Sequence, residues 1–305
     1  MNTTTADRSD VGQVTINKFS DDVLLEIFDF YRHWYIPFLD FVWNWQKLAQ
    51  VCRRWRRIIF ASPQRLKLSV SCDGLTRTRT LLDIWPPFPI SVHYPRWLGH
   101  HRWTVVDDRK VEENVIAALE NHVRITHIRL TDLRGSTLRR FVAVMLEPFI
   151  TLTHLALHSN ERTAPVLREA FLGGSSPHLR SFDLEGIAFP SLPRFFISSD
   201  LVYLSLWDIS TSGYISPEAM ATSLAPLANL ETLFIGFSSP QPRPNQLIPP
   251  PLARVVLPAL TRLSFRGVSE YLEDLVSRID TPALDELDIR FFTSTFHNCI
   301  SSLLA

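Results

Sequence analysis

Apolar residues recur in one spacing along the second half of the chain, apolar-x-x-apolar-x-apolar. The copies begin 22 to 30 residues apart. Alternation of apolar and polar positions within each copy is typical of a strand with one buried face. The seven copies are Ile125-x-x-Ile128-x-Leu130, Leu152-x-x-Leu155-x-Leu157, Leu179-x-x-Phe182-x-Leu184, Leu201-x-x-Leu204-x-Leu206, Leu230-x-x-Leu233-x-Ile235, Leu260-x-x-Leu263-x-Phe265 and Leu284-x-x-Leu287-x-Ile289.

Short helices are expected between these strands. Leu138, Phe141, Val142 and Met145 form one helical stripe, and a second begins at Leu272 and includes Leu275, Val276 and Ile279. A strand-turn-helix unit with a period of roughly 20–30 residues is the signature of leucine-rich repeats, which bury their apolar edges by stacking. The pattern therefore predicts an α/β solenoid, a horseshoe with a parallel sheet.

The predicted repeats are irregular. The ninth position of the pattern is Asn only at Asn160. Elsewhere we expect apolar side chains to fill most of these positions in place of a ladder of buried Asn side chains. The other ninth positions are Leu133, Ile187, Ile209, Ser238, Val268 and Phe292.

A different period marks the N-terminal part of the chain, where two helices are predicted. Leu24, Ile27, Phe28 and Tyr31 lie on one helical stripe, and Ser20 is placed to cap that helix. A second helix should end before Pro63. Its apolar stripe is Leu48, Val51, Cys52, Trp55, Ile58 and Ile59.

These patterns divide the chain into a disordered tail (1–15), a small helical domain (16–63) and a repeat domain (64–305). An aromatic link at 33–44 joins the two predicted helices. The connector at 238–251 contains six prolines. It is either a stiff surface loop or a docking site for a polyproline-binding module.

Composition narrows the functional classes. Lys plus Arg and Asp plus Glu both number 31, so no net positive charge favours nucleic acid. Three scattered cysteines indicate neither a disulfide framework nor a metal site, and they suit a reducing compartment. No signal core or membrane span is apparent, so we expect a cytoplasmic or nuclear protein. No phosphate-binding loop, nucleophile elbow or zinc-protease spacing occurs, and we expect no cofactor and no enzyme activity.

Two segments of the helical domain carry a family resemblance. The run Phe19-Ser20-Asp21-Asp22-Val23-Leu24-Leu25-Glu26-Ile27-Phe28, followed by Val51-Cys52-Arg53-x-Trp55, resembles an F-box. Phe19-Ser20 stands where the family usually has Leu-Pro. The segment 81–90 is similar to the strand that follows the F-box in many fungal members. The resemblance implies a Skp-type adaptor and, through it, a cullin as partners. It also implies these adaptor contacts: Phe19, Leu24, Leu25, Ile27, Val51 and Trp55.

A substrate surface is expected on the strands. Positions three, five and seven of each copy point away from the buried leucines, onto the concave face of the predicted horseshoe. An aromatic cluster flanked by charges is typical of an interface hot spot, unless a neighbouring loop covers it. The candidate substrate-binding residues are Tyr203, Trp207, Phe234, Arg262, Arg266 and Asp183.

The resemblance and the repeats together predict a substrate-recognition subunit of a cullin-RING ubiquitin ligase of the SCF type. The helical domain would dock on the adaptor, and the repeats would hold an unknown protein substrate for ubiquitin-dependent degradation. The alternative is a non-catalytic interaction scaffold, in which the F-box-like helices only cap the solenoid.

Overall fold

The computed structural model describes residues 16–33, 45–63, 70–72, 78–84, 86–94, 108–161, 165–174, 176–196, 200–240 and 254–292. The expected tail (1–15), residues 34–44 of the aromatic link and residues 241–251 of the proline-rich connector lie outside these residues. The chain divides into two compact units, Met1–Ser71 and Cys72–Ala305. The boundary was expected at residues 63/64, and each unit is described by itself.

The described part of the first unit is helical except for Val70 and Ser71, which begin the short strand β1 (Val70–Cys72) at the unit boundary. After a short 3-10 turn, η1 (Ile16–Lys18), it contains α1 (Asp21–His33), α2 (Trp45–Val51) and α3 (Arg53–Ala61). Ser20 caps α1 as predicted, because its Oγ accepts a hydrogen bond from the Val23 N–H at 3.3 Å. Arg54 of α3 holds the start of α1, donating to Asp21 Oδ1 at 2.7 Å and to the Phe19 carbonyl at 2.6 Å.

The second predicted helix is two helices, which corrects the continuous stripe expected through Cys52. Cys52 has extended backbone angles and caps α3, with its Sγ accepting from the Trp55 N–H at 3.4 Å. The Arg56 side chain donates to the Ala49 carbonyl at 3.0 Å, near the end of α2. Cys52 was expected in the core, and the break exposes its thiol instead.

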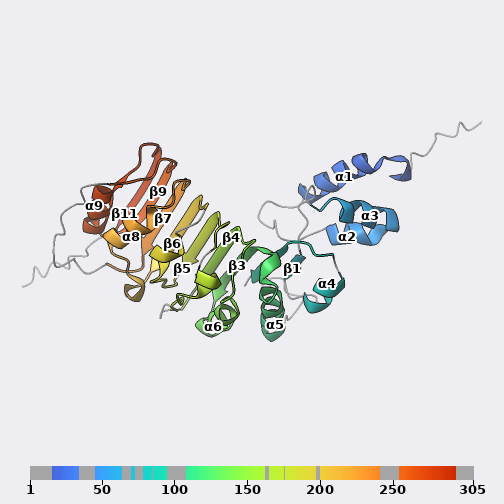
Figure 1. Cartoon of the computed structure of the whole chain (residues 1–305), viewed down its shortest axis with the longest axis horizontal. Helices are drawn as coiled ribbons and strands as arrows, with labels where there is room; N and C mark the ends of the chain where they lie inside the picture. Colours follow the sequence, from blue (N-terminus) through green and yellow to red (C-terminus); the bar gives the residue numbers. More distant parts are fainter. Residues whose placement is uncertain are drawn as a thin grey trace, which may run out of the picture. The chain divides into compact units, whose positions relative to one another are not determined.

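The second unit is built on a sheet in the order β2-β3-β4-β5-β6-β7-β9-β11 (Figure 1). From β2 to β11 every neighbouring pair of strands is parallel. The strands are β2 (Ile90–Tyr94), β3 (Ile125–Leu133), β4 (His154–Ser159), β5 (Ser181–Glu185), β6 (Tyr203–Ile209), β7 (Thr232–Phe237), β9 (Arg262–Gly267) and β11 (Glu286–Phe291).

Helices and short turns connect these strands, and α5, α6, α8 and α9 lie along one side of the sheet in Figure 1. The elements are α4 (Thr78–Ile84), α5 (Asp108–Leu119), η3 (His122–Arg124), α6 (Gly135–Val144), η4 (Phe171–Gly174), α7 (Leu192–Phe195), η5 (Thr211–Gly213), α8 (Pro217–Leu224) and α9 (Ser269–Arg278). The two helices predicted between strands are therefore present as α6 and α9. A separate two-stranded sheet pairs β8 (Val255–Val256) with β10 (Ile279–Asp280).

The apolar positions of the repeated pattern form the core of this unit. From the copy beginning at Ile125 to the copy ending at Phe265, these side chains are buried. Tyr271 of α9 stacks on Phe265 and packs edge-on against Phe237, which shows that this face of the sheet meets the helices. The predicted inward orientation of the pattern is confirmed for these six copies.

The seventh copy differs. β11 pairs with β9 in the expected register, but Leu287 is 54% exposed and Ile289 is 39% exposed. β11 is the edge of the sheet, and within the described residues no helix follows it to cover the apolar side. The apolar pattern therefore predicts the strand but not its burial.

Most of the ninth positions are filled by apolar side chains, as expected. Leu133, Ile187 and Ile209 are buried there. Asp132 and Asp208, each one residue earlier, have φ of 55°, and both lie in a strand bulge. Asp tolerates this left-handed conformation better than most residues do.

Candidate protein interaction sites

Helix α1 presents two apolar stripes. Leu24, Leu25 and Phe28 are buried, and Phe28 packs on the Trp55 ring at 4.8 Å between ring centroids. On another side of the helix, Val23, Ile27 and Phe30 follow the i, i+4, i+7 spacing and are 43%, 38% and 64% exposed. A helix that is apolar on more than one side usually has two packing partners. We call Val23, Ile27 and Phe30 the exposed α1 stripe.

The structure separates the six expected adaptor contacts. Phe19, Ile27 and Val51 are exposed, and Trp55 is half-buried. Leu24 and Leu25 are core residues with 0% and 6% exposure. Their side chains therefore hold α1 in place inside the unit and are not available as adaptor contacts. Sequence reasoning missed Val23 and Phe30 because one helical stripe had already been assigned. Their own i, i+7 spacing was the signal that would have found them.

The second candidate surface is the strand face opposite the buried leucines. Positions three, five and seven of neighbouring strands are in register, so their side chains form rows across the sheet. We call this the open strand face. It is not uniformly accessible, since Ser91 and His93 of β2 are buried, as are Ser205 and Ser264 nearer the middle of the sheet.

Three expected substrate-binding aromatics, Tyr203, Trp207 and Phe234, are half-buried on this face. The Tyr203 and Phe234 rings lie 5.6 Å apart. Burial, with a smaller contribution from the Asp183 charge, raises the pKa of the Tyr203 phenol. Because the aromatic side chains are partly accessible, they remain candidates for contact with a partner.

A bulge in β6 determines the position of the Trp207 side chain. Leu206 pairs with Ile235 and Ile209 with Phe237, so two residues of β6 lie opposite one residue of β7. That one residue is Gly236, and a Cβ built on it would lie 2.4 Å from Cε3 of Trp207. The indole therefore lies across β7 at the point where β7 has no side chain.

Acidic groups border these aromatics on β5. Asp183 is opposite Ser205, and Glu185 is opposite Trp207. His158 of β4 contacts both carboxylates, with Nε2 2.7 Å from Asp183 Oδ2 and Nδ1 3.5 Å from Glu185 Oε2. The structure thus joins Asp183 to two groups that were not among the selected candidates.

The two candidate arginines, on the other side of the aromatics, have partners within the chain. The Arg262 Nε lies 2.6 Å from Glu286 Oε2, and the Arg266 guanidinium lies 5.6 Å from the Phe292 ring centroid. Asp288 accepts from Ser264 at 3.4 Å and lies 3.1 Å from Arg290 Nη2. Much of the positive charge at this end is therefore balanced within the chain.

Histidines gather at the opposite end of the open strand face. His127 and His154 stack with 4.3 Å between ring centroids, and each Nδ1 contacts the hydroxyl of the preceding threonine. Burial, with a smaller contribution from His154, lowers the pKa of His127 to about 4. Burial also lowers the pKa of His93 to about 3, helped by His127 and Arg129, and burial lowers that of His154. The imidazoles of His93, His127 and His154 are therefore neutral near pH 7.

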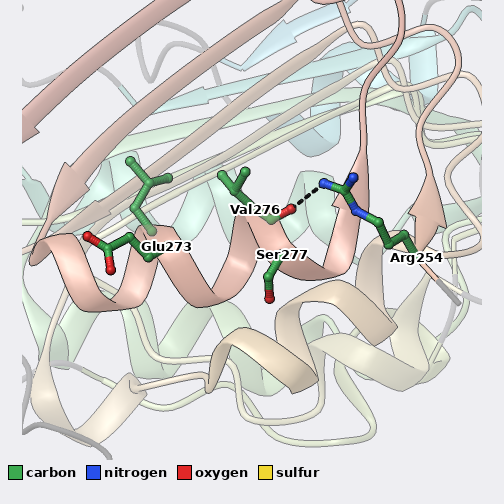
Figure 2. Close-up of a pocket in the computed structure, with 5 residues that line it drawn as sticks. Arg254, Glu273, Val276 and Ser277 are labelled. Carbon is green, nitrogen blue, oxygen red and sulfur yellow. Dashed lines mark hydrogen bonds between the residues drawn. The ribbon is translucent and has the colours of Figure 1, made fainter. Parts of the chain in front are cut away.

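A depression of about 620 Å³ lies beside α9, lined by Arg254, Leu272, Glu273, Val276 and Ser277 (Figure 2). The Arg254 guanidinium donates to the Val276 carbonyl at 2.6 Å. A cation near the last turn of a helix is favourable because it opposes the negative end of the helix dipole. Arg254 therefore has a structural role there, and the depression gathers no set of reactive groups.

Across the described ranges, no group of three or more His, Cys, Asp or Glu side chains is arranged to hold a metal ion. Nor does any helix in those ranges have the length and apolar character to cross a membrane. No protein-family model and no curated protein matches the chain.

Proposed function

We propose that this protein is a substrate-recognition subunit of an SCF-type cullin-RING ubiquitin ligase. In this proposal the first unit is an F-box that docks on a Skp-type adaptor. The second unit is an irregular leucine-rich solenoid that holds a protein substrate on its open strand face.

The exposed α1 stripe carries the adaptor part of the proposal. A small helical unit that has already buried Leu24, Leu25 and Phe28 still presents three large apolar side chains on α1. Contiguous exposed apolar surface of this kind marks interaction sites. Phe19, exposed just before α1, and Val51, exposed at the end of α2, would add to the contact.

The regular alternation of strands and helices supports the solenoid part. Parallel neighbouring strands carry the same apolar spacing, with ordinary helices or 3-10 turns between most of them. A repeat architecture extends a broad surface instead of enclosing a deep pocket. Such a surface contributes to ubiquitin transfer by proximity and orientation, which raise the effective concentration of the substrate at the charged enzyme.

The test is co-expression with a Skp-type adaptor and measurement of co-purification. Leu24→Asp would be a poor probe because Leu24 is fully buried and its loss would unfold the unit. A Val23→Asp, Ile27→Asp double variant changes the exposed stripe instead. Val276→Asp is the matched control, because Val276 is also on a helix and is 44% exposed, against 43% for Val23.

The proposal expects the wild type and Val276→Asp to retain the adaptor and the double variant to lose it, with circular dichroism unchanged for all three. Failure of the folded wild type to bind would favour the alternative, a scaffold in which the F-box-like helices have no adaptor. Equal loss in Val276→Asp would also count against a specific α1 contact.

A further inference from the structure

The acidic and aromatic rows of the open strand face adjoin each other, and their chemistry selects a type of ligand. We infer that strands β5 to β7 bind a protein segment that places a Lys or Arg side chain between Trp207 and Glu185, beside an apolar residue held by Tyr203 and Phe234. This inference deepens the proposed recognition role of the face and is independent of the adaptor contact.

The register of the strands makes the pairing possible. Glu185 and Trp207 are directly opposite each other on β5 and β6, and neighbouring strands lie about 4.8 Å apart. A long basic side chain that crosses β6 can contact the indole, which lies over Gly236 of β7, and reach the Glu185 carboxylate. Cation–π attraction is strongest for Trp, and Arg adds a planar fork that matches a carboxylate.

The relief of the surface provides room for such a segment. Ser205 is small and buried, and it lies among the larger side chains Tyr203, Phe234 and Trp207, whereas the space over Gly236 is filled by the Trp207 indole. The low position at Ser205 leaves the neighbouring aromatic rings as walls against which an apolar side chain can pack. An aromatic anchor point surrounded by polar groups is the usual composition of an interface hot spot.

The charge balance favours a basic ligand over an acidic one. His158 contacts both Asp183 and Glu185, and two carboxylates with one imidazole are net negative whether or not that imidazole is protonated. By contrast, Arg262 on the other side of the aromatics is paired with Glu286. An acidic or phosphorylated segment would meet the net negative charge of this β5 cluster beside Trp207.

The probe is a set of short fluorescent peptides with Leu at the centre, Arg, Gln or Glu at the adjacent positions, and the other positions randomised. Binding to the full chain is measured by fluorescence anisotropy. The inference expects Arg peptides to bind more tightly than Gln peptides, and Glu peptides to bind most weakly. Trp207→Ala should weaken the binding of Arg peptides roughly 30-fold, the scale of an interface hot spot.

The acidic contact is tested by Asp183→Asn with Glu185→Gln, which should remove most of the preference for Arg over Gln. The matched control is Glu218→Gln with Glu273→Gln, which removes two exposed carboxylates from α8 and α9, the helices on the other side of the sheet, and should leave the preference unchanged. Absence of binding, equal binding of the Arg and Glu peptides, or equal effects of the two double variants would overturn the inference.

Adaptor co-purification separates this inference from the proposed function. The β5 double variant should still co-purify with the adaptor to the same extent as the wild type. Loss of peptide selectivity with retained adaptor binding confirms that the two sites are distinct. Adaptor binding without any peptide preference in the wild type would remove the basic-ligand inference and leave the ligase proposal standing.

Discussion

The Trp207 indole occupies space that exists only because residue 236 is glycine. A Cβ at position 236 would lie 2.4 Å from Cε3 and 2.6 Å from Cζ3 of the indole, closer than real Cβ contacts allow. The φ angle of Gly236 is not positive, so its role is spatial rather than conformational. The pair links the bulge in β6 to the surface on which a ligand is proposed to bind.

Gly236→Ala should therefore displace the indole and destabilise the protein by about 1–3 kcal/mol, the usual cost of overpacking. Urea unfolding followed by circular dichroism measures the loss. In a Trp207→Ala background the same substitution should cost much less, because the clash is gone. An equal cost in both backgrounds would mean that Gly236 is needed for some other reason.

The two stripes of α1 should respond differently to truncation. Leu24→Ala should cost about 2–5 kcal/mol, because Leu24 is fully buried and its loss leaves a cavity. Ile27→Ala should change the free energy of unfolding by about 0.5 kcal/mol or less, as surface substitutions usually do. Equilibrium unfolding of the full chain, monitored by helical circular dichroism, compares them. Similar losses for both would show that Ile27 is covered in solution.

Cys52 offers a test of the break between α2 and α3. Cys52→Ser should preserve the cap, because a hydroxyl also accepts the hydrogen bond from the Trp55 N–H. Cys52→Ala removes the acceptor and should cost about 1 kcal/mol relative to Cys52→Ser. The measurement is the urea midpoint of unfolding of each variant. Equal midpoints for Cys52→Ser and Cys52→Ala would show that the hydrogen-bond acceptor at position 52 contributes nothing measurable to stability.

Stability should fall as the pH drops below 7. His93 has a pKa of about 3 in the folded chain, below its ordinary value of 6.5, because burial disfavours the imidazolium. Between these two values the unfolded chain binds a proton that the folded chain does not, so stability is full above pH 6.5 and is lost as the pH falls. At pH 5 the loss from His93 is at most about 2 kcal/mol.

His127 should add to this loss down to about pH 4, because its pKa is also lowered by burial. Urea midpoints at pH 7.5 and pH 5 measure the combined effect. His93→Gln removes one titrating imidazole while keeping a polar side chain, and it should reduce the difference between the two midpoints. An unchanged difference would show that His93 is protonated alike in both states.

The sequence spacing predicted the strands well because each strand carries its own alternation. Leu204 and Leu206 were expected inside and are buried, and the same holds for the other copies up to Phe265. Cys52 was predicted less well, because an apolar stripe continues across it even though its backbone is extended. Local capping broke a helix that side-chain periodicity favoured.

For the candidate sites, the residue types were readable but their partners were not. Asp183, Tyr203 and Trp207 could be selected from the pattern, whereas the contact of Asp183 with His158 joins residues from two different repeats. Val23 and Phe30 were missed because an exposed apolar stripe and a buried one have the same helical spacing. Spacing identifies a face of a helix, but neighbouring elements determine whether that face is covered.

The sequence by itself determined the period of the strands, the division into a helical and a repeating part, and the set of side chains that share one face. These follow from backbone geometry, which places every second residue of a strand on the same side. Only the tertiary structure decided that Leu24 is buried while Ile27 is exposed, that β11 leaves Leu287 uncovered, and that Trp207 lies across Gly236. Burial and close contact depend on residues that are far apart in the chain, and local periodicity does not specify which of these residues meet.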